Sequence, residues 1–284
     1  MAHSTASSLI SGINYAKSYF GGTGSKKDTD SARNGMFRGL SSKPVEGFVG
    51  YIADRFPDLT ADQITEFGEK LVKLSGQLAE ADPDNATLAT GVFTIGGLCD
   101  LIDGTFARYK GTADGNGTSA EGMITDVEAD KRQEIAILIN LSNIALKRKN
   151  YVASTNYALA AMTRVLPSLF RAGAESKGYI CDEDGIGTRV GVAILSGIGM
   201  AMNNNEAVSN LVSSMILQGN INTTLQRKDV SQRGADSPYC VGFNDDPQFL
   251  ELGALRSEVL TPLAIEGARL GAQNLAKIYM ETTK

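Results

Sequence analysis

Four aspartates at helical spacing constrain this chain more than any other feature of its sequence. Asp100 and Asp103 are three residues apart and Asp126 and Asp130 are four apart, so each pair lies on one face of a helix. If the two helices are neighbours, the four carboxylates meet. Close carboxylates repel one another unless some are protonated or a cation lies between them. The pattern therefore predicts a site for a hard divalent cation, which prefers oxygen ligands.

Small residues and one arginine accompany these aspartates at fixed positions. Gly104, Ala107 and Arg108 follow the first pair, and Gly122 precedes the second. A glycine in such a helix lets a ligand approach the backbone closely. The pattern Asp-x2-Asp-Gly-x2-Ala-Arg, followed by Gly-x3-Asp-x3-Asp, resembles the signature of the CDP-alcohol phosphotransferases, also called CDP-alcohol phosphatidyltransferases. All eight fixed positions are present, although the intervening segment, Tyr109–Glu121, is longer than is usual in that family.

The resemblance implies a function and a mechanism. The family transfers a substituted phosphate group from a CDP-alcohol to an acceptor hydroxyl and releases CMP, as in phospholipid or polyol-phosphodiester synthesis. By resemblance, the four aspartates would hold two Mg²⁺ or Mn²⁺ ions, and Asp130 would be the general base. The substrate-binding residues implied in the same way are Gly104, Ala107, Arg108, Gly122 and, in the lengthened loop, Ser119.

Three further stretches resemble the family outside the motif. Asp62 and Thr65 lie where the family enters its first helix and helps to hold the nucleotide, with Asp62 in place of the usual Asn. Arg171, within Leu169–Glu175, and Arg189 also match positions of the family. Both arginines are candidates for binding an anionic acceptor, and a purely structural role fits them equally well.

Composition excludes several classes of function. The net charge of −5 argues against nonspecific binding of nucleic acid. His3 is the only histidine, which excludes a Ser-His-Asp or Cys-His mechanism. Three widely spaced cysteines, Cys99, Cys181 and Cys240, predict neither a disulfide framework nor a zinc site and favour a reducing compartment. No basic region precedes an apolar run at the start, so no secretory signal is predicted.

The apolar runs are shorter than membrane spans. The best two, Ile135–Leu146 and Val190–Met202, fall well below the roughly 20 residues that a spanning helix needs. The sequence therefore favours a cytoplasmic soluble or membrane-peripheral protein, whereas the resemblance implies an integral membrane protein with six spanning helices. Two interpretations stay open: an enzyme that uses a water-soluble CDP-alcohol, and a water-soluble variant, natural or engineered, of a membrane enzyme.

The organisation predicted is one helical domain behind a polar arm. Residues 1–43 are rich in Ser, Gly, Lys and Asp, and residues 44–284 form the domain. Strand-type alternation is scarce, so the fold class predicted is all-α, a bundle of about six core helices behind an amphipathic N-terminal helix. A homodimer is implied by the resemblance alone. The predicted helices cover residues 44–56, 60–80, 86–109, 122–148, 151–174 with Pro167 as a kink, 190–202, 206–218, and 247–282 interrupted at Pro262.

Two non-catalytic alternatives remain on the sequence alone. The chain would then be a relative that binds metal and CDP without turnover, or a helical interaction protein. The intact aspartates and Arg108 favour an enzyme over both.

Overall fold

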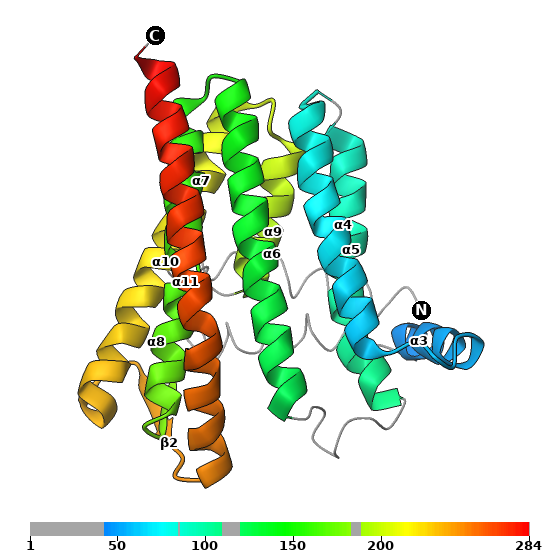
Figure 1. The fold of residues 1–284 in the computed structure, drawn as a ribbon, viewed down its shortest axis with the longest axis vertical. Helices are drawn as coiled ribbons and strands as arrows, with labels where there is room; N and C mark the ends of the chain where they lie inside the picture. Colours follow the sequence, from blue (N-terminus) through cyan, green and yellow to red (C-terminus); the bar gives the residue numbers. More distant parts are fainter. Residues whose placement is uncertain (1–42, 85, 110–119, 183–188, 284) are drawn as a thin grey trace. The chain divides into compact units, whose positions relative to one another are not determined.

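The computed structural model describes residues 43–84, 86–109, 120–182 and 189–283, and this part of the chain is almost entirely helical (Figure 1). The all-α prediction is confirmed. Two short antiparallel strands, which the sequence did not predict, accompany the helices. None of the described helices combines the length and apolar character needed to cross a membrane. The elements are α3 (Lys43–Arg55), α4 (Ala61–Ala81), α5 (Ala86–Tyr109), α6 (Ala120–Lys147), α7 (Tyr151–Thr163), α8 (Leu166–Glu175), β1 (Tyr179–Cys181), α9 (Arg189–Ala201), α10 (Glu206–Arg233), a 3-10 turn (Gly234–Asp236), β2 (Cys240–Phe243) and α11 (Pro247–Thr282).

The chain forms two compact units. One comprises residues 1–61 and 102–117, and the other comprises residues 62–101 and 118–284. In the first, α3 buries Val49 and Ala53, whereas the large apolar side chains of Phe48 and Tyr51 are exposed. The predicted polar arm, residues 1–43, lies outside the described residues except for its last position. The rest of this subsection concerns the second unit.

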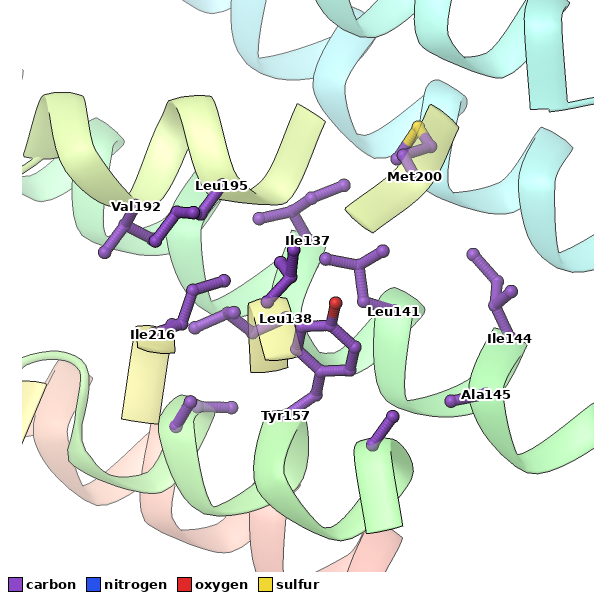
Figure 2. Packing of buried hydrophobic residues seen from close by; sticks show 14 of the residues in the cluster. Ile137, Leu138, Leu141, Ile144, Ala145, Tyr157, Val192, Leu195, Met200 and Ile216 are labelled. Carbon is purple, nitrogen blue, oxygen red and sulfur yellow. The ribbon is translucent and has the colours of Figure 1, made fainter. Parts of the chain in front are cut away.

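The core of the second unit is built around α6 and α7. Figure 2 shows the ring of Tyr157, from α7, beside Leu138 and Leu141 of α6, with Ile216 of α10 close by. These α6 residues recur at helical spacing, which is why one face of the helix is apolar. All four residues are fully buried or nearly so, and burial raises the pKa of the Tyr157 phenol.

Small side chains let the helices around α7 approach closely. Ser142 Oγ donates a hydrogen bond to Ser154 O at 2.7 Å, and Ser154 Oγ donates one to Ser142 O at 2.8 Å, so α6 and α7 are joined reciprocally. On the other side α11 presents glycine. A Cβ atom at Gly271 would lie 2.6 Å from Ala158 O of α7, closer than real Cβ contacts.

A buried ion pair joins α6 to the junction of α7 and α8. Arg164 lies at that junction with only 1% of its surface exposed. Its guanidinium donates to both carboxylate oxygens of Glu134, at 2.9 and 2.6 Å, and to Asn220 Oδ1 of α10 at 2.8 Å. Burial alone would raise the pKa of Glu134, but the positive charges of Arg164 and Lys131 outweigh it and lower the pKa to about 2.

Two of the predicted helix boundaries are wrong because proline was misjudged. The predicted helix 151–174 is two helices, and Pro167 lies in the first turn of α8, where its missing N–H is tolerated. Pro262 does not interrupt α11, which runs continuously over 36 residues.

The predicted end of a helix at Gln218 is also wrong. Helix α10 continues to Arg233, and the polar residues Asn220 and Thr223 are buried within it. The polar composition after Gln218 predicted the end of the helix there, but the Asn220 side chain bonds inside the unit: its Nδ2 donates to Ala160 O at 3.1 Å. The sequence did not predict the two strands, because three or four residues are too few to show an alternating pattern of polar and apolar side chains.

Replacing Gly271 with Ala should destabilise the protein. The new Cβ would meet backbone, which cannot move aside, so we expect a loss of roughly 1–3 kcal/mol in the free energy of unfolding. Gly91→Ala is the matched control, because nothing lies within 4 Å of a Cβ at that helical position. The control should gain about 0.5–1 kcal/mol from helix propensity. Chemical denaturation measures both, and equal effects at the two sites would contradict the close packing of α11 on α7.

The Glu134 ion pair should give stability that acid removes. Because the folded-state pKa of Glu134 is lowered, the contribution is complete above about pH 4.5 and disappears as the pH falls through about 2. At neutral pH, Glu134→Gln should cost on the order of 3 kcal/mol, since two buried cations lose their carboxylate. The difference from wild type should shrink towards pH 2.

Denaturant titrations of both proteins between pH 7 and pH 2 measure this convergence. Glu66→Gln is the control, because Glu66 pairs with Lys70 at 2.8 Å on the exposed surface of α4. The control should have a far smaller effect. A Glu134→Gln deficit that stayed constant over the whole pH range would mean that lost packing, and not the charge, destabilises the variant.

Candidate active site

The two halves of the aspartate motif lie on two helices. Asp100 and Asp103 are on α5, and Asp126 and Asp130 are on α6. Each pair lies in one uninterrupted helix, so the spacing predicted from sequence puts each pair on one helical face. Asp103 belongs to the first compact unit and the other three belong to the second. The meeting of all four carboxylates therefore stays a prediction.

The face of α6 that carries Asp130 is directed into the second unit. Glu134 follows one turn later and is paired with buried Arg164, and Leu138 follows one turn after that in the hydrophobic core. Residues four apart share a helical face, so Asp130 continues the same inward stripe towards the start of α6. Its side chain is 7% exposed, in agreement with this arrangement.

Close contacts fix how α4, α5 and α6 lie along one another. A Cβ at Gly96 of α5 would be 2.9 Å from Gly68 O of α4, and one at Gly76 of α4 would be 2.8 Å from Asn140 Cβ of α6. At one end of the unit, Arg148 Nη2, just beyond α6, donates to Pro83 O at 2.7 Å in the turn between α4 and α5.

The same contacts bring several predicted site residues to one level of the second unit. The contact between Gly76 of α4 and Asn140 of α6 serves as a common reference level. Thr65 lies before Gly76 by nearly the same number of residues as Asp130 lies before Asn140, and each residue adds about 1.5 Å along a helix. Asp100 comes one turn after Gly96, on the antiparallel α5. Thr65, Asp100 and Asp130 thus lie at a similar height, at the end remote from Pro83. Asp62, exposed in the first turn of α4, lies at this end too.

The chemistry of the motif side chains fits a divalent cation. Asp103 and Asp130 are 9% and 7% exposed, and carboxylates are rarely that buried unless they are paired or bind a metal. Their oxygens are the ligands that Mg²⁺ and Mn²⁺ prefer. Among the side chains that the structure describes, no three His, Cys, Asp or Glu residues are grouped closely enough to hold a metal, and the side chains of Asp100 and Asp126 are outside that set.

The sequence did not predict the buried charged residues next to Asp130, which are Lys131 and Glu134 of α6 and their partner Arg164. Lys131 is buried, and its Nζ donates to Glu134 Oε2 at 2.5 Å. Burial, followed by the charge of Arg164, lowers the pKa of Lys131, while Glu134 and Asp130 oppose the shift. Glu134 could have been found, since it repeats the four-residue spacing of Asp126 and Asp130. Arg164 could not, because its partner is remote in sequence.

The predicted acceptor-binding arginines differ in what the structure describes. Arg171 Nε donates to Glu175 Oε1 at 2.6 Å, and Glu175 Oε2 also accepts a bond from Arg256 at 3.0 Å, so Arg171 has a structural ion pair. Arg189 is the first residue of α9, and its side chain is not described. Ser119 lies outside the described residues. The remaining predicted substrate residues occupy helical positions without described side chains: Gly104, Ala107 and Arg108 on α5, and Gly122 on α6.

A known protein family matches the part of the chain that carries the motif. The profile of the CDP-alcohol phosphatidyltransferase family matches residues 59–224, more than half of the chain. No curated protein matches the sequence. Among solved structures, the fold is similar to that of the Mycobacterium tuberculosis phosphatidylinositol phosphate synthase crystallised with CDP-DAG bound, with a TM-score of 0.57 and 18% identity over 66% of this chain and 92% of that one. The chain therefore belongs to the CDP-alcohol phosphatidyltransferase family and is a transferase of substituted phosphate groups.

Proposed function

We propose that the chain catalyses metal-dependent transfer of a substituted phosphate group from a CDP-alcohol to an alcohol acceptor, with release of CMP. The observation that carries the proposal is the complete eight-residue motif on α5 and α6, with Asp103 and Asp130 buried. A solvated helix face would leave both carboxylates in water. The level shared by Thr65, Asp100 and Asp130 in the second unit gives it further support.

Asp100, Asp103, Asp126 and Asp130 would hold the cations, two Mg²⁺ or Mn²⁺ ions by family resemblance. When bound, such ions neutralise the diphosphate and stabilise the charge that develops during transfer. Arg108 would pair with a phosphate oxygen through its guanidinium, and Gly104 and Gly122 would leave room for the nucleotide. Ala107, Ser119, Asp62 and Thr65 would complete the contacts to the CDP group, and Arg171 and Arg189 are the candidates for an anionic acceptor.

Asp130 would act as the general base. In its ionised form this carboxylate can take the proton of the acceptor hydroxyl. The acceptor oxygen then forms a bond to the phosphorus distal to cytidine. The bond from that phosphorus to the bridging oxygen breaks, and CMP leaves with the electron pair. The hydrogen bond between buried Lys131 and Glu134 would keep the turn of α6 that follows Asp130 rigid.

Asp130→Asn should lower the rate of CMP release at least about 100-fold, the usual contribution of a positioned general base. The assay follows CMP from CDP-diacylglycerol and from water-soluble CDP-glycerol, each with glycerol phosphate, inositol phosphate or serine as acceptor. Glu128→Gln is the matched control, a carboxylate on the same helix that pairs with Arg132 at 2.5 Å and is partly exposed. It should keep the wild-type rate. Equal, slow CMP release from wild type and Asp130→Asn would end the catalytic assignment.

Binding of CDP should depend on the divalent ion. Titration calorimetry with Mn²⁺ present should give a measurable dissociation constant, and prior removal of the ion with EDTA should weaken binding at least about tenfold, because the diphosphate charge is then unneutralised. Tight, ion-dependent binding without turnover on any substrate pair would identify a non-catalytic CDP-binding relative. Binding that ignores the metal would argue against the aspartate cluster as the site.

A further inference from the structure

We infer that Cys181 and Cys240 form a thiol pair that a low-molecular-mass disulfide, such as oxidised glutathione, converts to an internal disulfide. The two residues are far apart in sequence but face each other across the β1–β2 ladder, where their Cα atoms are register partners. Both cysteines are reduced in the structure. The inference is independent of the proposed catalytic mechanism.

The hydrogen bonds beside the pair define its geometry. Asp182 N donates to Tyr239 O at 3.0 Å, so Asp182 and Tyr239 are the hydrogen-bonded neighbours. The register of the two strands shifts between Ile180 and Cys181, and Cys181 with Cys240 lies on the same side of that shift as Asp182 with Tyr239. Next to a hydrogen-bonded pair, Cys181 and Cys240 form a non-hydrogen-bonded pair, a kind whose Cα atoms are about 4.5 Å apart in a regular antiparallel ladder. Disulfides need Cα separations of roughly 4.4–6.8 Å. The spacing typical of such a pair lies within that range, so the pairing of Cys181 with Cys240 suits the bond, and side-chain rotation is the main change required.

The two thiols have different surroundings, which assigns them different roles. Cys240 is half-buried, and its Sγ donates to Gly242 O at 3.3 Å, whereas Cys181 is buried against Ala174 and Val230. Burial raises the pKa of the Cys181 thiol to about 11, and the nearby Cys240 adds to the increase. Cys240 is therefore the thiol that a solvent-borne oxidant meets first.

The exchange is balanced as two substitutions at sulfur. The Cys240 thiolate attacks one sulfur of oxidised glutathione, and one glutathione thiolate leaves. Cys181 then loses its proton to solvent and attacks Cys240 Sγ, and the second glutathione thiolate leaves. Two protein thiols are oxidised and one external disulfide is reduced to two thiols.

The bond would join two helix ends that are distant in sequence. β1 follows α8 and β2 precedes α11, so the bond encloses α9 and α10 in a covalent loop. The two ends already touch: a Cβ at Gly253 of α11 would lie 2.4 Å from Ser176 N, at the end of α8. Oxidation should therefore stabilise the folded state by restricting the unfolded chain without displacing either helix.

The test uses the full chain carrying Cys99→Ser, which leaves only the two thiols of interest. After incubation with oxidised glutathione and removal of the reagent, the denatured protein should show no free thiol, a mass lower by two hydrogen atoms, and a higher Tm than the dithiothreitol-treated sample. Adding Cys181→Ser or Cys240→Ser should abolish the increase in Tm. The Cys181→Ser variant should instead retain a glutathione adduct on Cys240.

Wild-type protein provides the second measurement, which does not depend on the Cys99 variant folding. Digestion of the oxidised wild type without reductant should give a peptide in which Cys181 is linked to Cys240. The inference would be overturned if Cys181 and Cys240 both kept free thiols after oxidation, or if each of these two carried a glutathione. A covalent dimer, or a disulfide that involves Cys99, would overturn it as well.

Discussion

The bidentate pair between Glu134 and Arg164 is the interaction on which the second unit depends. It lies where the inner face of α6 changes from charged to apolar, with Asp130 one turn before it and Leu138 one turn after. A buried carboxylate without its cation would be costly, so α6 must present this face to the junction of α7 and α8. The same rotation of α6 directs the Asp130 position inward. The rotation of α6 about its own axis therefore determines both how the core packs and where Asp130 is placed.

Small residues make the rest of that arrangement possible. Ser142 and Ser154 bond each other's backbone carbonyl oxygens, and Gly271 lets α11 approach α7. At the far side of the unit, Gly96 and Gly76 bring α5 and α6 against α4. These contacts set the relative heights of the helices. Because height along the bundle decides which motif residues lie level with each other, close packing remote from the site contributes to its geometry.

Much of the fold was predictable because helical periodicity is a local property. The spans of α4, α5, α6 and α9 agree with prediction to within a few residues, and both halves of the motif lie on helices as expected. Errors arose where a residue's preference depends on its partners. Asn220 has the composition of a loop residue, but in the folded chain its amide is hydrogen-bonded to Arg164 and to Ala160 O within a helix. Pro167 was predicted to kink a helix, but it lies in the first turn of α8. The role of Arg164 was not predictable for the same reason, because its partner Glu134 is remote in sequence.

The sequence by itself determined the helical class, the family and the spacing of the aspartates, because each of these is written within a few turns of one helix or in a motif of fixed length. Only the tertiary structure decided which helix faces are buried, that Arg164 neutralises Glu134, and that Cys181 lies opposite Cys240, a pair that spacing alone had given no reason to join. The physical reason is range. Helical preference acts between residues a few positions apart, whereas ion pairing, burial and strand register act between residues that only the folded chain brings together.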